Sequence, residues 1–147
     1  MDFDNFTDRS RGFIQSAQLL AMDYGHQYLT PLHLLKCLLE DKEGVATKLI
    51  LSAGGDDKRV RDLTESELGK LPRVEGSGAG KVHLGEEIVR VFKQAKKIAE
   101  ESGDSFTTVE KILLAIVVVG ELSSKKVFKG ANLNAQSLNK AIKNLRQ

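Results

Sequence analysis

The feature that most restricts the fold of this chain is an internal duplication with an offset of 78 residues. Residues 25–39 read GHQYLTPLHLLKCLL, and residues 103–117 read GDSFTTVEKILLAIV. Similarity at one fixed offset over this much chain indicates two copies of one structural unit. The positions that keep the same residue class in both copies are Gly25/Gly103, Tyr28/Phe106, Thr30/Thr108, Leu34/Ile112, Leu35/Leu113, Leu38/Ile116 and Leu39/Val117.

Each copy has the pattern of a corner between two helices. Gly25 and Gly103 suit the position after a helix end, where the backbone adopts a positive φ. Thr30 is a suitable N-cap with Pro31 at the first helical position, and Thr108 is expected to cap the second copy in the same way. Aliphatic residues then recur at helical spacing. The sequence therefore predicts the same helix–turn–helix corner twice.

The same spacing predicts an all-α chain with eight helices and no sheet, four helices in each half. We expect one domain over 1–147, with repeat one at 1–71 and repeat two at 85–147. The segment 72–84 is rich in glycine and serine and is expected to be a mobile linker. Other residues expected to cap helices are Thr7, Asp56, Gly85 and Asn134.

Composition excludes several classes of protein. The 147 residues, 41% of them hydrophobic, are enough for a core, and 22 basic against 20 acidic residues give no electrostatic case for nucleic acid or membrane surfaces. The single cysteine, Cys37, allows no disulfide and is expected to be a small buried hydrophobe. The acidic start 1–4 is not a signal peptide, and the apolar run 112–119 is too short to span a bilayer. We therefore expect a cytoplasmic location.

No catalytic or metal-binding arrangement stands out, and we expect the chain not to be an enzyme. The run from Gly76 to Lys81 is no phosphate loop, because Glu75 and Val82 stand where that motif requires glycine and a hydroxyl residue. The three histidines lack metal-ligand spacing and are expected in loops or on the surface. They are His26, His33 and His83.

Several motifs occur in one order along the chain: FIQSAQ at 13–18, GHQ at 25–27 with TPLHLL at 30–35, SAGG at 52–55, LPRVEGSG at 71–78, and KIAE at 97–100 followed by GDSF at 103–106. Through these motifs and its duplication the chain resembles the N-terminal domain of Clp-family AAA+ chaperones, and within that family the ClpB disaggregases. The resemblance covers essentially the whole chain. It implies a pseudo-twofold pair of four-helix repeats, with the two ATPase modules of the parent protein absent from this chain.

The resemblance also implies a function. The domain would engage unfolded or aggregated polypeptides and pass them to the AAA+ ring, in cooperation with the DnaK chaperone system. The isolated domain is expected to be monomeric and without cofactor, whereas the hexameric parent would bind ATP and magnesium. An alternative is docking of adaptor proteins or of phosphoarginine, as in the related Clp protease unfoldases. Phosphoarginine recognition in both halves would need an acid after each corner; Glu110 provides one, but Leu32 occupies the matching position.

The site that the resemblance implies combines a polar cluster with an apolar groove on the fifth expected helix. Each residue also has a structural interpretation: Thr7 as an N-cap, Glu110 as a dipole partner in a first helical turn, and Phe92 and Ile98 as core residues. Asp104 follows a helix end, where a carboxylate is unfavourable unless paired, and Thr7 is a candidate partner. The implied client-binding residues are Thr7, Phe92, Ile98, Asp104 and Glu110.

The sequence departs from the family pattern at two groove positions. Gln94 and Lys111 stand where relatives often have leucine.

Overall fold

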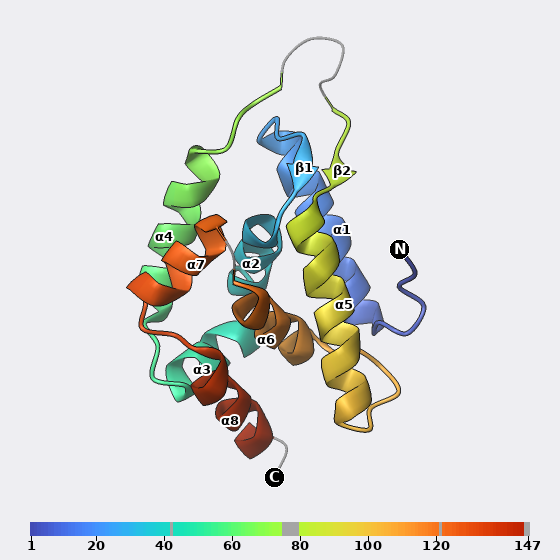
Figure 1. Ribbon diagram of the computed structural model, residues 1–147. Helices are drawn as coiled ribbons and strands as arrows, with labels where there is room; N and C mark the ends of the chain where they lie inside the picture. The colour runs from blue at the N-terminus through green and yellow to red at the C-terminus, as the bar shows by residue number, and fades with distance from the viewer. Residues whose placement is uncertain (42, 75–79, 121, 146–147) are drawn as a thin grey trace.

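Eight helices and one short pair of strands make up the part of the chain that the computed structural model describes, which is residues 1–147 without 42, 75–79, 121 and 146–147 (Figure 1). The helices are α1 Asp8–Asp23, α2 Pro31–Leu39, α3 Val45–Ser52, α4 Asp57–Gly69, α5 Glu86–Glu101, α6 Val109–Val119, α7 Leu122–Gly130 and α8 Ala135–Leu145. The strands are β1 Tyr28–Leu29 and β2 His83–Leu84.

The helices confirm the all-α prediction and the duplication. Both ends of α5 lie 78 residues after the ends of α1, and α2, α3 and α4 are followed at the same offset, within a few residues, by α6, α7 and α8. Gly25 and Gly103 both have φ of 74°. That backbone conformation is nearly free of strain only for glycine, which explains why the residue recurs at both corners.

The core is built around the second helix of each repeat. In Figure 1, α2 and α6 lie in the middle of the molecule, with α1 and α5 on one side and α4 and α7 on the other. The inward residues of α2 include Leu34 and Leu35, and those of α6 include Ile112 and Leu113, all of them fully buried. Helix α2 also packs on α5 and α6, so the two repeats share one core.

The prediction of no sheet was wrong in one detail. Strand β1, at the corner of repeat one, pairs in parallel with β2, which leads into α5. The equivalent pairing in repeat two joins Phe6, ahead of α1, to Thr107 at the other corner. These pairings, two residues long in repeat one and a single bridge in repeat two, satisfy backbone groups at the corners. They are too short to leave a periodic signal in the sequence.

The described ends of the segment 72–84 are held by backbone hydrogen bonds. The Val74 N–H donates to the Gly25 carbonyl at 2.7 Å, and Arg73 forms an antiparallel bridge with His26. Strand β2 holds the other end to β1. Both ends of the linker are therefore attached to the corner of repeat one, while 75–79 lie outside the described residues.

Two of the three histidines are buried, contrary to expectation. His26 and His33 are 5% and 0% exposed, whereas His83 is exposed. The Thr30 N–H donates to His33 Nδ1 at 3.0 Å, so the ring proton of His33 lies on Nε2 and is donated to His26 Nδ1 at 2.8 Å. This hydrogen bond gives the polar nitrogens of two buried imidazoles a partner inside the corner. The spacing of the histidines in the sequence does not predict that the two rings meet. Tyr24 stacks on the outer ring, His26, at 5.0 Å between centroids.

The two threonine caps differ, which the sequence did not predict. Both Thr30 and Thr108 precede a helix in extended conformation, but in repeat one the N–H of the cap residue also donates to a side chain, His33 Nδ1, at 3.0 Å. The residue three positions later is His33 in repeat one and Lys111 in repeat two. An ammonium group cannot accept a backbone N–H, and Lys111 turns to a carboxylate instead.

Replacing Gly103 with alanine should lower the free energy of unfolding by about 1 kcal/mol, because φ is positive there. No atom lies within 4 Å of a Cβ added at this position, so the cost is one of backbone conformation alone. The matched control is Gly12→Ala inside α1, which also meets no atom within 4 Å and should raise stability. Urea unfolding of both variants checks this; equal effects would contradict it.

Candidate functional site

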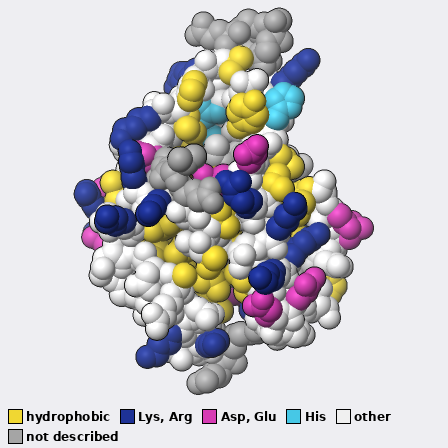
Figure 2. Space-filling view, in the orientation of Figure 1, with side chains coloured by type: hydrophobic (Ala, Val, Ile, Leu, Met, Phe, Trp, Pro, Cys, Tyr) yellow, Lys and Arg dark blue, Asp and Glu magenta, His cyan; other side chains and the backbone are white. Residues whose placement is uncertain are grey.

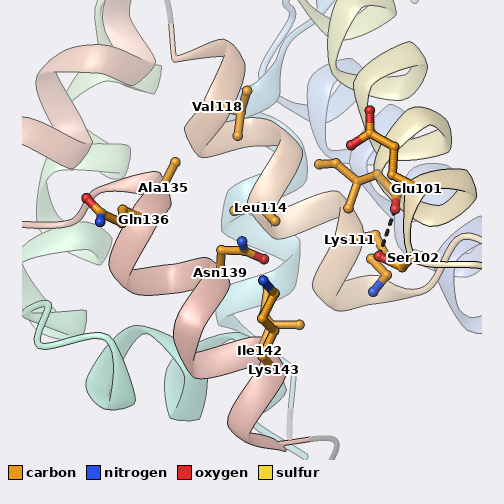
Figure 3. A pocket seen from close by; sticks show the side chains of 11 residues that line it. Glu101, Ser102, Lys111, Leu114, Val118, Ala135, Gln136, Asn139, Ile142 and Lys143 are labelled. Carbon is orange, nitrogen blue, oxygen red and sulfur yellow. Dashed lines mark hydrogen bonds between the residues drawn. The ribbon is translucent and has the colours of Figure 1, made fainter.

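A groove with a volume of about 610 Å³ opens on repeat two between α5, α6 and α8 (Figure 3). Its apolar side chains are Ile98, Leu114, Val118, Ala135 and Ile142. Its polar side chains are Glu101, Ser102, Lys111, Gln136, Asn139 and Lys143. Figure 2 shows hydrophobic side chains exposed on the face toward the viewer, with charged side chains around them. The groove therefore combines an aliphatic floor with a polar rim.

The helices leave Ile98 and Val118 partly exposed for local reasons, whereas Leu114 and Ile142 are buried beneath them, at 5% and 2% exposed. On α5 the apolar stripe runs through Val91, Phe92 and Ala95 in the core, and its last turn carries Ile98 to the edge, where it is half-buried. Helix α6 is buried along most of its length, but its end emerges, and Val118 is 45% exposed. The groove thus lies where two apolar stripes extend beyond the core.

An ion pair holds Lys111, one of the residues that line the groove. Lys111 is 2% exposed, and its Nζ lies 3.2 Å from Asp104 Oδ2. A buried ammonium is tolerated only with a compensating charge, and the Asp104 carboxylate supplies it. The leucine that relatives often have at position 111 would need no such partner. The expectation that Asp104 has a partner is met, but the partner is Lys111. Asp104 therefore has a structural role as the partner of a lysine that lines the groove.

Thr7 also has a structural role. Its Oγ1 accepts the Ser10 N–H at 3.1 Å and so caps α1, and its hydroxyl donates to Ser10 Oγ at 2.8 Å. Its own N–H donates to the Thr107 carbonyl at 3.1 Å. Because the hydroxyl proton is directed to Ser10, the suggested hydrogen bond from Thr7 to Asp104 is not formed.

The five sequence-predicted residues separate into three groups. Ile98 lines the groove. Phe92 is 0% exposed in the core, where its ring meets those of Phe3 and Phe6 at 5.0 and 6.1 Å. The polar three lie about the corner of repeat two, outside the lining of the groove: Thr7, Asp104 and the half-buried Glu110 in the first turn of α6.

The prediction from the sequence placed the groove on the fifth helix and so missed most of it. The residues Leu114, Val118 and Ile142 lie on α6 and α8. A signal was present in the duplication. At the equivalent positions repeat one has Lys36, Glu40 and Thr64. Aliphatic residues that replace polar ones between two copies of a unit indicate a face that only one copy uses.

Burial raises the pKa of the Cys37 thiol to about 11, so the sulfur stays protonated near neutral pH. No group of three metal-ligating side chains occurs among the residues with described positions. In the same part of the chain, no helix combines the length and the apolar character needed to cross a membrane.

Comparison with known proteins agrees with this architecture. Residues 5–131 match the family described as the Clp repeat (R) N-terminal domain. The chain is 48% identical to the chaperone protein ClpB of Rhodopseudomonas palustris and 42% identical to that of Agrobacterium fabrum, in each case over all 147 residues but only 17% of the relative. The fold is similar to that of the Hsp104 N-terminal domain from Candida albicans, with a TM-score of 0.82, 24% identity, and coverage of 97% of this chain and 92% of that one. The chain therefore belongs to the Clp repeat N-terminal domain family.

Proposed function

We propose that the domain binds apolar segments of unfolded or aggregated polypeptides in the groove between α5, α6 and α8, and passes them to the AAA+ ring of an ATP-dependent disaggregase. The observation that carries this proposal is an aliphatic groove left open to solvent, with Val118 45% exposed beside the half-buried Ile98. Exposed aliphatic surface with a polar rim is typical of a site for another polypeptide.

The chemistry of the groove suits weak binding of many sequences. An aliphatic floor attracts any apolar side chain without regard to sequence, and each fully buried one contributes roughly 1.5–3 kcal/mol. Glu101 and Lys143 put both signs of charge on the rim, so neither acidic nor basic segments are excluded. After the cost of ordering an unfolded chain, the net affinity is low, which allows release toward the ring.

ATP hydrolysis, ring formation and cooperation with other chaperones would belong to a longer protein like the ClpB relatives, of which this chain would be one domain. Because the chain spans 17% of the length of its ClpB relatives, the ATPase modules, with their ATP and magnesium, would follow elsewhere in that protein. The hexameric ring, cooperation with DnaK and a cytoplasmic location are proposed on the same ground. Phosphoarginine recognition in both halves loses support, because Leu32, the position that would need an acid, is 1% exposed in the core.

Val118→Glu should lower the affinity for reduced, unfolded casein by at least about ten-fold, because it places a charge on the aliphatic floor. Stability should change by less than about 0.5 kcal/mol, because the side chain is exposed and repeat one has Glu40 at the equivalent position. Fluorescence anisotropy and thermal unfolding measure the two quantities.

The matched control is Leu19→Glu, the same kind of change at a 56% exposed position of α1. It should leave casein binding unchanged. An amide NMR titration of the unmodified domain should move resonances of Ile98, Leu114 and Val118. If shifts cluster elsewhere, or if both variants bind like the unmodified domain, the groove is not the client site.

A further inference from the structure

Repeat one contains a counterpart of the groove at the offset of 78 residues. Helices α1, α2 and α4 correspond to α5, α6 and α8. A hollow between α2 and α4 has a volume of about 170 Å³, against about 610 Å³ for the groove. Its lining residues Lys36, Glu40, Arg61, Thr64 and Glu65 correspond to Leu114, Val118, Asn139, Ile142 and Lys143.

An aromatic side chain in the counterpart reaches from the end of α1 to α4. Tyr24 stands at the position that Ser102 occupies in repeat two. The Tyr24 ring lies nearly parallel to His26, at an angle of 7°, and its hydroxyl donates to Glu65 Oε2 on α4 at 3.2 Å. Ser102 is small and exposed, and its hydroxyl bonds back to the Ile98 carbonyl at 2.9 Å. The ring therefore bridges α1 and α4, whereas nothing equivalent extends from Ser102.

Ion pairs close the outer part. The Lys36 ammonium on α2 pairs with Glu65 on α4 and, at 3.0 Å, with Glu40. The positions equivalent to Lys36 and Glu40 are Leu114 and Val118, which form the aliphatic floor of the groove. Charged side chains that pair across the helices thus replace the surface on which a peptide would lie.

We propose that repeat one holds a closed copy of the polypeptide-binding groove, kept shut by Tyr24 and by the Lys36–Glu65 pair, so that of the two equivalent grooves only the one in repeat two binds an apolar segment. This inference rests on the function proposed for repeat two. It assigns a role to three residues: they set how many of the two equivalent grooves can hold a client segment. The backbone of repeat one, which has the same helices at the same offset, already has the form of the second site.

The test transfers the residues of repeat two into repeat one. The opened variant carries Tyr24→Ser, Lys36→Leu, Glu40→Val and Glu65→Lys, which reproduce Ser102, Leu114, Val118 and Lys143. A short unstructured peptide rich in leucine and valine is titrated into each protein by calorimetry and amide NMR. The unmodified domain should bind one peptide with shifts in repeat two, and the opened variant should bind two, with new shifts in α1, α2 and α4.

A reciprocal variant decides the question if the opened one does not fold. Ser102→Tyr, Leu114→Lys and Lys143→Glu should close the groove of repeat two and lower the affinity by at least about ten-fold, since the aliphatic floor is lost. Unchanged binding by this folded variant would overturn the inference. A folded opened variant that still binds one peptide would also overturn it while leaving the proposed function intact. An unmodified domain that binds no peptide would overturn both.

Discussion

Phe92→Ala should lower the free energy of unfolding by about 3–5 kcal/mol, because it removes a fully buried ring from the core. The ring makes edge-to-face contacts with Phe3 and Phe6, which join the segment ahead of α1 to α5. Deleting it leaves a cavity that a packed helix pair cannot collapse to fill. Urea unfolding, with midpoint and slope fitted separately, measures the loss.

The control for this variant is Ile98→Ala on the same helix. Ile98 is half-buried at the groove, so its truncation should cost less stability but weaken casein binding. Comparing the two variants distinguishes an apolar residue of α5 that stabilises the core from one that contacts the client. A Phe92→Ala protein of nearly unchanged stability would contradict the structural role given to this ring.

Lowering the pH from 7 to 4 should destabilise the domain by up to about 3 kcal/mol through His33 alone. Burial is the main cause that lowers the pKa of His33 to about 4 from an ordinary value of 6.5, and burial lowers that of His26 as well. The folded state therefore favours the neutral ring, while the unfolded state takes up the proton near pH 6.5. This contribution is fully present above pH 6.5 and is lost as the pH falls toward 4.

Chemical denaturation at a series of pH values measures this effect. His33→Asn keeps an acceptor for the Thr30 N–H but does not titrate, so its stability should depend less steeply on pH between 6.5 and 4. His83→Gln, which removes an exposed imidazole, should retain the steep dependence. Identical slopes for His33→Asn and the unmodified domain would contradict the assignment.

The helices were predictable because each is encoded by local signals. Thr7, Asp56 and Asn134 cap helices through their side chains as their residue types suggest, and the corner glycines have the expected positive φ. The pairing of Phe6 with Thr107 was not predictable, because it depends on how two distant segments meet after the helices pack. Burial of the two histidines was missed for the same reason.

The candidate site was only partly predictable. An apolar stripe on α5 shows which residues avoid water, but the point at which the stripe leaves the core depends on the position of α8. Phe92 and Ile98 therefore look alike in the sequence and differ in the structure, one in the core and one in the groove. The position-by-position difference between the repeats carried more information about the groove than the residues that the family resemblance implied.

The reciprocal strand pairings have a consequence for synthesis of the protein on the ribosome. The segment that precedes α1 pairs with Thr107, about a hundred residues later in the chain. Strand β1 can pair only after β2 has been synthesised. The first four helices therefore emerge with both of their edge segments unpaired, and neither half completes its own backbone hydrogen bonds. Loop closure over such separations is slow compared with helix formation. The nascent first repeat is thus itself an incompletely folded chain until the second repeat has been translated as far as Thr107.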